Sequence, residues 1–212
     1  MTATQASIGV IGGSGFYEFL SDAREVRVDT PFGPPSDPLM IGTVAGRSVA
    51  FLPRHGRDHR YPPHRIPYLA NLWALRAVGV RQVLAPSAVG SLTAEHGPGT
   101  LVVINGPRFS TRAESQWYAA QGWTLVGMTG HPEAALAREL ALCYTTLALV
   151  TDTDAGVAEG EGVTYHEVMD VFARNVARLR DLLMRVIENL PEQRSCPCAG
   201  ALDGQKLPIE LP

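Results

Sequence analysis

The stretch that decides the fold is "IGVIGGSGFYEF", residues 8–19, in which a short apolar run is followed at once by glycines and a serine. We expect a β-strand that ends in a loop whose backbone N–H groups can approach a small anion. The glycines stand at positions 9, 12, 13 and 15, so the dinucleotide pattern G-x-G-x-x-G cannot be read here, and no P-loop lysine follows. Taken alone, such a loop is more often a plain strand-to-helix turn.

Short apolar or β-branched runs recur along the whole chain: "SIGVIG", "EVRVDT", "PLMIGTV", "RSVAFLP", "RQVLAPSAV", "LVVING", "WTLVGMT" and "TTLALVTD". Helical patterns separate the later runs but not the early ones. Strands that alternate with helices indicate a parallel sheet, and strands without helices between them indicate antiparallel pairs. The sequence therefore predicts an α/β fold, one domain over residues 1–212, with a mixed, mainly parallel sheet flanked by helices.

Three segments carry helix signals. In "HRIPYLANLWALRAVGV", residues 64–80, one helical face is predicted to be buried. Capping boxes at Thr111-x-x-Glu114 and Thr164-x-x-Glu167 are each expected to open a helix. The helix after Thr164 is predicted to be long and amphipathic and to end near Pro191. The residues of the first predicted face are Ile66, Leu69, Ala70, Trp73 and Ala77, and those of the last helix are Val168, Val171, Phe172, Leu179, Leu183, Val186, Ile187 and Leu190.

Composition excludes several classes of function. Of the 212 residues, 45% are hydrophobic and 18% are charged, and the net charge is -3, with no basic stripe for a nucleic acid or a membrane surface. The first residues lack a basic region followed by a long apolar one, and no apolar run reaches transmembrane length. We therefore expect a cytoplasmic protein.

The three cysteines do not form a disulfide framework. Cys143 is predicted to lie in the core, in an apolar helix end. Cys196-Pro197-Cys198 could be a redox pair or half of a metal site, but no cluster of histidine or cysteine in the sequence supports a metal. Reduced surface thiols are the interpretation that the sequence favours for this pair, and no metal site is predicted.

Polar side chains follow the predicted strands at the end where α/β sheets bind ligands. Each of them alone is more readily explained as a cap or turn residue. Together, the small hydroxyls and one guanidinium suit a phosphate, which Arg can bind through two parallel hydrogen bonds. The residues collected in this way are Ser14, Arg54, His55, Ser87, Ala88, Met128, Thr129, Asp152 and Asp154.

Asp152 and Asp154 are alternate residues of an extended segment and therefore face the same way. The simplest role for them is loop capping. As a pair they could instead accept hydrogen bonds from an exocyclic amine of a purine and stabilise a protonated ring nitrogen. A phosphate cradle beside such a pair suggests phosphate attack on a nucleoside.

Eight blocks, in order, resemble the methylthioadenosine phosphorylase branch of the trimeric purine nucleoside phosphorylases. The resemblance extends over nearly the whole chain to about Leu190, and eight ordered blocks do not match by chance. It implies that the glycine loop holds phosphate. The blocks are "GVIGGSGFY", "DTPFGPPSD", "PRHGRDH", "NLWAL", "SAVGSL", "INGPRFSTRAES", "MTGHPEAALARE" and "TDTDAG".

The resemblance implies a role for each matched residue. Phosphate would be bound by Ser14, Arg54, His55, Ser87 and Thr129. Ala88, Phe109 and Met128 would contact the ribose and purine, and Asp152 and Asp154 would hold the adenine edge, with Asp152, Asp154 and His55 as the catalytic group. Specificity near the base and the 5′ group would depend on Ser110, Tyr165 and Val168. The branch that prefers 6-oxopurines carries Asn where Asp152 stands, so the carboxylate indicates a 6-aminopurine.

One departure from the family pattern follows Thr100. The family continues there with a long segment that holds "DRT"-like residues and a histidine reaching a neighbouring subunit's site, whereas Leu101 follows directly in this sequence. The segment is either deleted from the protein or omitted from the sequence. The motifs on both sides are intact, and this favours omission.

The sequence thus predicts an enzyme, a pentosyltransferase that cleaves methylthioadenosine or a related adenine nucleoside with inorganic phosphate as co-substrate and no metal or organic cofactor. The resemblance implies a homotrimer with small-molecule ligands only. Three alternatives stay open: a purine nucleoside phosphorylase of 6-oxopurine or broader specificity, a nucleosidase that uses water, and a purine-binding relative without catalysis.

Overall fold

The computed structural model describes residues 5–13, 16, 20, 22–93, 101–103, 108–153 and 164–212, without the side chains of residues 101–103, 165, 167–169 and 172. Its centre is a mixed sheet with the strand order β2-β3-β4-β1-β5-β7-β6, in which β8 also pairs with β5. The strands are β1 (Ile8–Gly12), β2 (Arg24–Val26), β3 (Leu39–Val44), β4 (Arg47–Pro53), β5 (Gln82–Ser91), β6 (Leu101–Val103), β7 (Leu125–Gly127) and β8 (Cys143–Thr153).

The central strands β4, β1, β5 and β8 run parallel, and the early strands β2, β3 and β4 pair antiparallel. The predicted fold class is therefore confirmed, including the antiparallel part expected where no helix separates the strands. The sequence-predicted strands all appear, with β2 shorter than its run and β8 beginning earlier, at Cys143.

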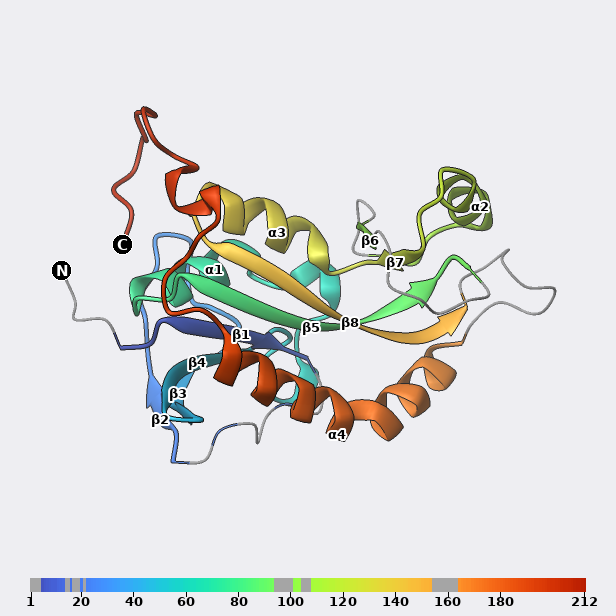
Figure 1. The fold of residues 1–212 in the computed structure, drawn as a ribbon, viewed down its shortest axis with the longest axis horizontal. Helices are drawn as coiled ribbons and strands as arrows, with labels where there is room; N and C mark the ends of the chain where they lie inside the picture. The colour runs from blue at the N-terminus through green and yellow to red at the C-terminus, as the bar shows by residue number, and fades with distance from the viewer. Residues whose placement is uncertain are drawn as a thin grey trace.

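Helices cover both faces of the sheet (Figure 1). α1 (Tyr68–Ala77) and α3 (Gly130–Glu139) lie on one face, and α4 (Tyr165–Asn189) crosses the other. α2 (Arg112–Ala120) lies to one side with β6 and β7, and the short 3-10 helices are η1 (Arg57–His59), η2 (Pro63–Arg65) and η3 (Pro197–Gly200). No helix among the described residues has the length and apolar character that a membrane span requires.

Two hydrophobic cores follow from the alternation of side chains along each strand. Ile11, Leu52 and Val83 belong to the core under α1 and α3, and their neighbours in sequence belong to the core under α4. Those neighbours are Val10, Phe51 and Leu84. Consecutive apolar residues are therefore both buried, which explains why the central strands read as continuous apolar runs rather than as alternating ones.

α1 is buried almost all round, and its predicted buried face was wrong in one place. Leu69 is 46% exposed, whereas Leu72, Ala74 and Leu75, outside the predicted face, are fully buried. The helix packs on the sheet and also against α3 beside it, so two sides of it are buried rather than one. Periodicity over ten residues therefore identified the helix but not its orientation.

α2 and α4 begin where the capping signals place them. The Thr111 side chain accepts a hydrogen bond from the Glu114 backbone N–H, and the Glu114 side chain accepts one from the Thr111 N–H, which completes a capping box. α4 begins directly after Thr164, as predicted, and the side chain of Glu167 lies outside the described residues.

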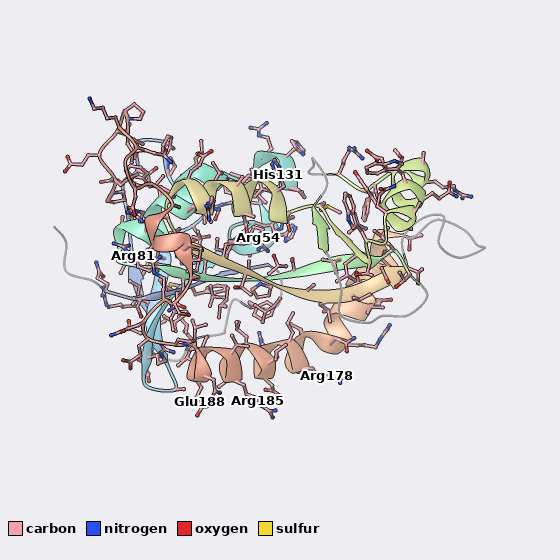
Figure 2. The ribbon with its side chains drawn as sticks, turned by 45° about the horizontal axis from the view of Figure 1, so that its top comes forward. Arg54, Arg81, His131, Arg178, Arg185 and Glu188 are labelled. Carbon is pink, nitrogen blue, oxygen red and sulfur yellow. The ribbon has the colours of Figure 1, made fainter. Side chains whose placement is uncertain are left out.

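α4 packs on the sheet through Leu179, Leu183 and Ile187, which recur every four residues and are buried. Figure 2 shows Arg178, Arg185 and Glu188 on the opposite side of the helix, away from the sheet.

We expect Leu183→Ala to lower the free energy of unfolding by about 2–5 kcal/mol, because Leu183 is fully buried and its removal leaves a cavity. The matched control is Leu182→Ala on the same turn, where the side chain is 50% exposed. That variant should change the free energy by no more than about 0.5 kcal/mol. Urea denaturation followed by circular dichroism measures both, and equal losses would contradict the packing of α4.

Candidate functional site

Arg54 is the best-defined polar residue at the carboxyl ends of the central strands. It follows β4 directly, and its backbone N–H donates to Gly12 O of β1 at 2.7 Å. Its guanidinium is buried and donates to two further carbonyls, Pro86 O of β5 and Ile11 O of β1, each at 3.1 Å. Arg54 therefore lies where β1 and β4 end, beside the middle of β5, and the carboxyl ends of strands are the place at which ligands bind in α/β sheets.

The guanidinium of Arg54 forms a two-point ion pair with Glu133 of α3. Nε donates to Oε1 at 2.6 Å and Nη2 to Oε2 at 3.2 Å, and both side chains are almost fully buried. Tyr144 of β8 donates its hydroxyl to the same carboxylate at 2.7 Å. Burial opposes the charge on Arg54, but the Glu133 carboxylate outweighs burial and raises the pKa of Arg54 further above its ordinary value. The guanidinium is therefore held as a rigid cation.

Among the described residues, four hydrogen bonds account for all five side-chain N–H donors of Arg54 except one on Nη1. A Cβ atom built on Gly13 would lie 3.9 Å from this Nη1, so the remaining donor is next to the glycine loop. At Gly12 a Cβ atom would come within 2.6 Å of the Phe51 ring, which explains glycine at this position. The guanidinium thus lies close to Gly13, at the beginning of the loop.

His55 is largely buried beside Arg54. Its Nδ1 donates to Tyr61 O at 2.9 Å, and its ring stacks on that of His59 with centroids 4.0 Å apart. Burial is the main cause that lowers the pKa of His55 to about 4, and the neighbouring His59 and Arg54 add to it. The ring is therefore neutral at pH 7, with Nδ1 protonated and Nε2 left as an acceptor.

Ser87 and Ala88 are half-buried residues of β5, opposite Ala148 and Leu149 of β8. Thr129 immediately precedes α3, and its side chain makes no capping hydrogen bond to that helix. The backbone of His131 is not helical, so the regular part of α3 and the positive end of its dipole begin after His131, close to the Glu133 that binds Arg54. Figure 2 shows His131 at this end of α3, above Arg54.

Asp152 lies near the end of β8, beyond a bulge that shifts the register between Val89 and Gly90 of β5. Thr151 Oγ1 donates to Asp152 Oδ1 at 2.7 Å and contacts Val89 O at 3.3 Å. A bulge re-aims side chains at the end of a strand, and this one holds a half-buried carboxylate there. The arrangement fits an acceptor for a ligand amine.

The other predicted residues fall into two groups. Met128 is half-buried between β7 and α3, whereas Phe109 is 52% exposed and Ser110 accepts from Ser115 Oγ at 2.9 Å on the α2 segment. Figure 1 shows α2 at the side of the molecule where β6 and β7 lie, away from α1 and α3. Ser14 and Asp154, and the side chains of Tyr165 and Val168, lie outside the described residues.

Known proteins match this chain over nearly its whole length. The phosphorylase superfamily matches residues 7–106 and 99–188. The chain belongs to the phosphorylase superfamily. A purine nucleoside phosphorylase of Streptomyces coelicolor is 52% identical, with 98% of each chain covered. An S-methyl-5'-thioadenosine phosphorylase of Mycolicibacterium smegmatis is 47% identical, with 97% of this chain and 99% of that protein covered.

Solved phosphorylase structures share the fold. A methylthioadenosine phosphorylase from an antarctic soil metagenomic library has a TM-score of 0.80 at 31% identity, with 94% of this chain and 92% of that chain covered. The Schistosoma mansoni methylthioadenosine phosphorylase in complex with adenine has a TM-score of 0.80 at 29% identity, with 92% and 96% covered. The resemblance predicted from the sequence blocks is confirmed, and so is the enzyme class, a phosphorylase that transfers a pentosyl group.

The two pieces of the superfamily match meet around residues 99–106. The alignment with the Streptomyces coelicolor phosphorylase runs over 275 positions although this chain has 212 residues, so that relative contains residues with no counterpart here. Whether they all belong after Thr100 stays a prediction, and residues 94–100 lie outside the described part of the chain.

Sequence reasoning missed Glu133, the partner of the phosphorylase's Arg54. The residue stands in the block "MTGHPEAALARE", and an acidic side chain among small apolar residues of a helix is the signal that could have found it. It is 1% exposed, so its charge requires a buried partner. Glu133 is a positioning residue, because it orients Arg54 and leaves the Nη1 donor toward the glycine loop.

We expect Glu133→Gln to lower the free energy of unfolding by about 3 kcal/mol, because the Arg54 cation would lose its buried counter-charge. The variant should also raise the KM for phosphate, since the guanidinium would no longer be held by two bonds. Glu139→Gln, at the exposed end of the same helix, is the matched control and should change neither quantity. An unchanged phosphate KM in a folded Glu133→Gln protein would contradict the positioning role.

The low pKa of His55 predicts how stability responds to acid. The unfolded chain gains a proton on this residue near pH 6.5, whereas the folded protein does so only near pH 4, so the unfolded state binds more protons between these values. The contribution of His55 to stability is present above about pH 6.5 and is lost as the pH falls toward 4. His55→Gln should reduce the loss of stability between pH 6.5 and 4.5, as measured by urea denaturation at each pH, and an unchanged slope would refute the neutral ring.

Proposed function

We propose that this phosphorylase cleaves the N-glycosidic bond of methylthioadenosine with inorganic phosphate and releases adenine and 5-methylthioribose 1-phosphate. The observation that carries the proposal is Asp152 at the bulged end of β8, a carboxylate where the resemblance implies Asn in enzymes that prefer 6-oxopurines. Relatives named S-methyl-5'-thioadenosine phosphorylase at 46–47% identity support it, as does a solved relative bound to methylthioadenosine with a TM-score of 0.79.

Phosphate is bound at the ends of β1 and β4, beside the middle of β5. Arg54 Nη1 and the N–H groups of the glycine loop donate to it, with Ser14, Ser87 and Thr129 as hydroxyl donors and the positive end of α3 nearby. Because His55 is neutral, its Nε2 accepts the hydrogen bond of a protonated phosphate oxygen rather than adding a positive charge. The anion is thus oriented while its attacking oxygen stays nucleophilic.

The purine leaves as phosphate attacks the anomeric carbon through an oxocarbenium-like transition state. Asp152, oriented by the Thr151 hydroxyl, accepts from the exocyclic amine and, with Asp154, stabilises protonation of a ring nitrogen, so adenine departs as a neutral base. Ala88, Phe109 and Met128 contact the nucleoside. Ser110, Tyr165 and Val168 determine the fit near the base and the 5′ group.

Phosphate is the co-substrate of phosphorylases, and we propose that no metal or organic cofactor takes part in this reaction. Relatives bind small purine ligands, adenine and methylthioadenosine. We further propose a homotrimer, as the resemblance implies, in which a neighbouring subunit completes the nucleoside site. The cytoplasmic location stays a prediction.

A second candidate is a purine nucleoside phosphorylase of broader specificity. It is favoured by the relative of that name at 52% identity, a higher value than the 47% of the methylthioadenosine phosphorylase compared above. Tyr165 also favours it, because a phenol is bulkier and more polar than the small apolar residue that suits a methylthio group. Turnover of methylthioadenosine, adenosine and inosine, compared at saturating phosphate, distinguishes the two candidates.

We expect Asp152→Asn to lower kcat/KM for methylthioadenosine by about ten- to a hundredfold, because a hydrogen bond to a charged group is worth roughly 1.5–3 kcal/mol. The same change should raise kcat/KM for methylthioinosine or inosine, since the Asn amide can donate to a 6-oxo group. Asp181→Asn, an exposed residue of α4, is the matched control and should alter neither substrate.

The outcomes of this assay separate the alternatives. Equal losses on both substrates would mean that Asp152 does not read the base, and no change would contradict the adenine assignment. Turnover without phosphate would indicate a nucleosidase. Adenine binding without turnover in the wild-type protein would indicate a purine-binding relative that lacks catalysis.

A further inference from the structure

The chain has three cysteines, and the fold brings all of them to one place. Cys143 is the first residue of β8, and the segment after α4 returns Cys196 and Cys198 to it. The Sγ atoms of Cys143 and Cys196 are 3.2 Å apart, and all three Sγ atoms lie within 4.8 Å of one another. The prediction of a core cysteine in a helix end was wrong, because Cys143 begins a strand and is only half-buried.

Hydrogen bonds from three side chains fix the course of this returning segment. Arg47 Nη1 donates to Ile187 O at 2.8 Å and also to Leu190 O, Gln82 Nε2 donates to Pro191 O at 3.0 Å, and Arg194 Nη1 donates to Ala141 O at 2.8 Å. The last bond joins Arg194, two residues before Cys196, to Ala141, two residues before Cys143. The meeting of the thiols therefore follows from the way the segment is attached to the sheet.

The surroundings of the thiols are positively charged. Burial and the nearby charges of Arg81 and Arg194 lower the pKa of Arg76, and burial and Arg194 lower the pKa of Arg81, so the three guanidinium groups lie close together. Their hydrogen bonds go to the backbone carbonyls of Leu140, Arg76, Val80 and Ala141. Within the described part of the chain, no carboxylate forms an ion pair with any of the three. Positive charge therefore stands beside Cys143 and Cys196, because the bond between Arg194 and Ala141 lies two residues from each of them.

We propose that Cys143, Cys196 and Cys198 form a three-thiolate binding site for a soft metal ion, Zn²⁺ or Cu⁺. Such ions prefer thiolate ligands, and with metal–sulfur bonds of about 2.3 Å two sulfurs on one ion stand no more than about 4.6 Å apart. Small rotations of the C-x-C side chains bring the three Sγ atoms to these distances. The ion replaces the three S–H protons, which pass to solvent, and the neighbouring arginines balance the anionic thiolates.

Bound metal would join the segment after α4 to the beginning of β8, at the opposite end of that strand from Asp152. β8 starts at Cys143 and reaches Asp152 only near its other end, so the metal site is distinct from the nucleoside site. The site is structural rather than catalytic, and binding of the ion stabilises the folded chain by mass action.

The test is an anaerobic titration of reduced, chelator-treated, untagged protein with Co²⁺. Because the chain has no other cysteine, a thiolate-to-cobalt absorption band reports on this cluster alone. We expect one Co²⁺ per chain, displaced by Zn²⁺, and separate competition with a Cu⁺ chelator distinguishes the two natural ions. Cys143→Ser, Cys196→Ser and Cys198→Ser should each weaken binding at least tenfold, and the adjacent Ser195→Ala control should bind as the wild type does.

Three results would overturn the proposal. The first is no thiolate-to-cobalt band in the wild-type protein. The second is an unchanged affinity for Co²⁺ in Cys143→Ser, which would mean that Cys196 and Cys198 bind the ion without Cys143. The third is a disulfide between Cys143 and Cys196 that persists under mild reduction and leaves one titratable thiol. Zn²⁺ should also raise the Tm of the wild type but not of Cys196→Ser, and this second readout holds even where a variant is less stable.

Discussion

The site depends on one buried ion pair, that between Arg54 and Glu133. Two charges removed from water are stabilised only if their remaining donors and acceptors are also satisfied. Here the guanidinium donates hydrogen bonds to backbone carbonyls of β1 and β5, and the carboxylate accepts one from the Tyr144 hydroxyl of β8. The ion pair therefore joins three parallel strands to α3. The same contacts that satisfy the charges therefore determine the positions of the strand ends, the glycine loop and the start of α3.

The sheet supports this arrangement because both of its faces are covered. Residues that alternate along β1, β4 and β5 supply one core under α1 and α3 and a second under α4, so the central strands cannot shift register without exposing apolar side chains. The polar groups at the carboxyl ends are consequently built on rigid elements. Asp152 is displaced from this regular pattern by a bulge, and a local irregularity at the end of a strand is a common way to aim a functional side chain.

The electrostatics of the site differ from a simple cluster of cations around an anion. Arg54 is already paired, and His55 is neutral, so the proposed phosphate site relies on oriented N–H and hydroxyl donors and the α3 dipole more than on net charge. Phosphate held in this way keeps the electron density that its attack on the anomeric carbon requires. Membership of the phosphorylase superfamily and the position of Asp152 at the end of β8 support the proposed reaction at this site.

The sequence by itself determined the fold class, the strands, the helix starts at Thr111 and Thr164, and the family, because apolar runs, capping boxes and ordered motifs are local patterns. Only the tertiary structure decided what depends on partners distant in the chain. Glu133 lies far from Arg54 in sequence, and Cys143 meets Cys196 because the last segment folds back onto β8. Leu72 and Leu75, outside the predicted face, are buried because α1 packs against both the sheet and α3. The local sequence determines whether a segment tends to form a helix or a strand, whereas the charge state and contacts of a side chain depend on the residues that the fold places beside it.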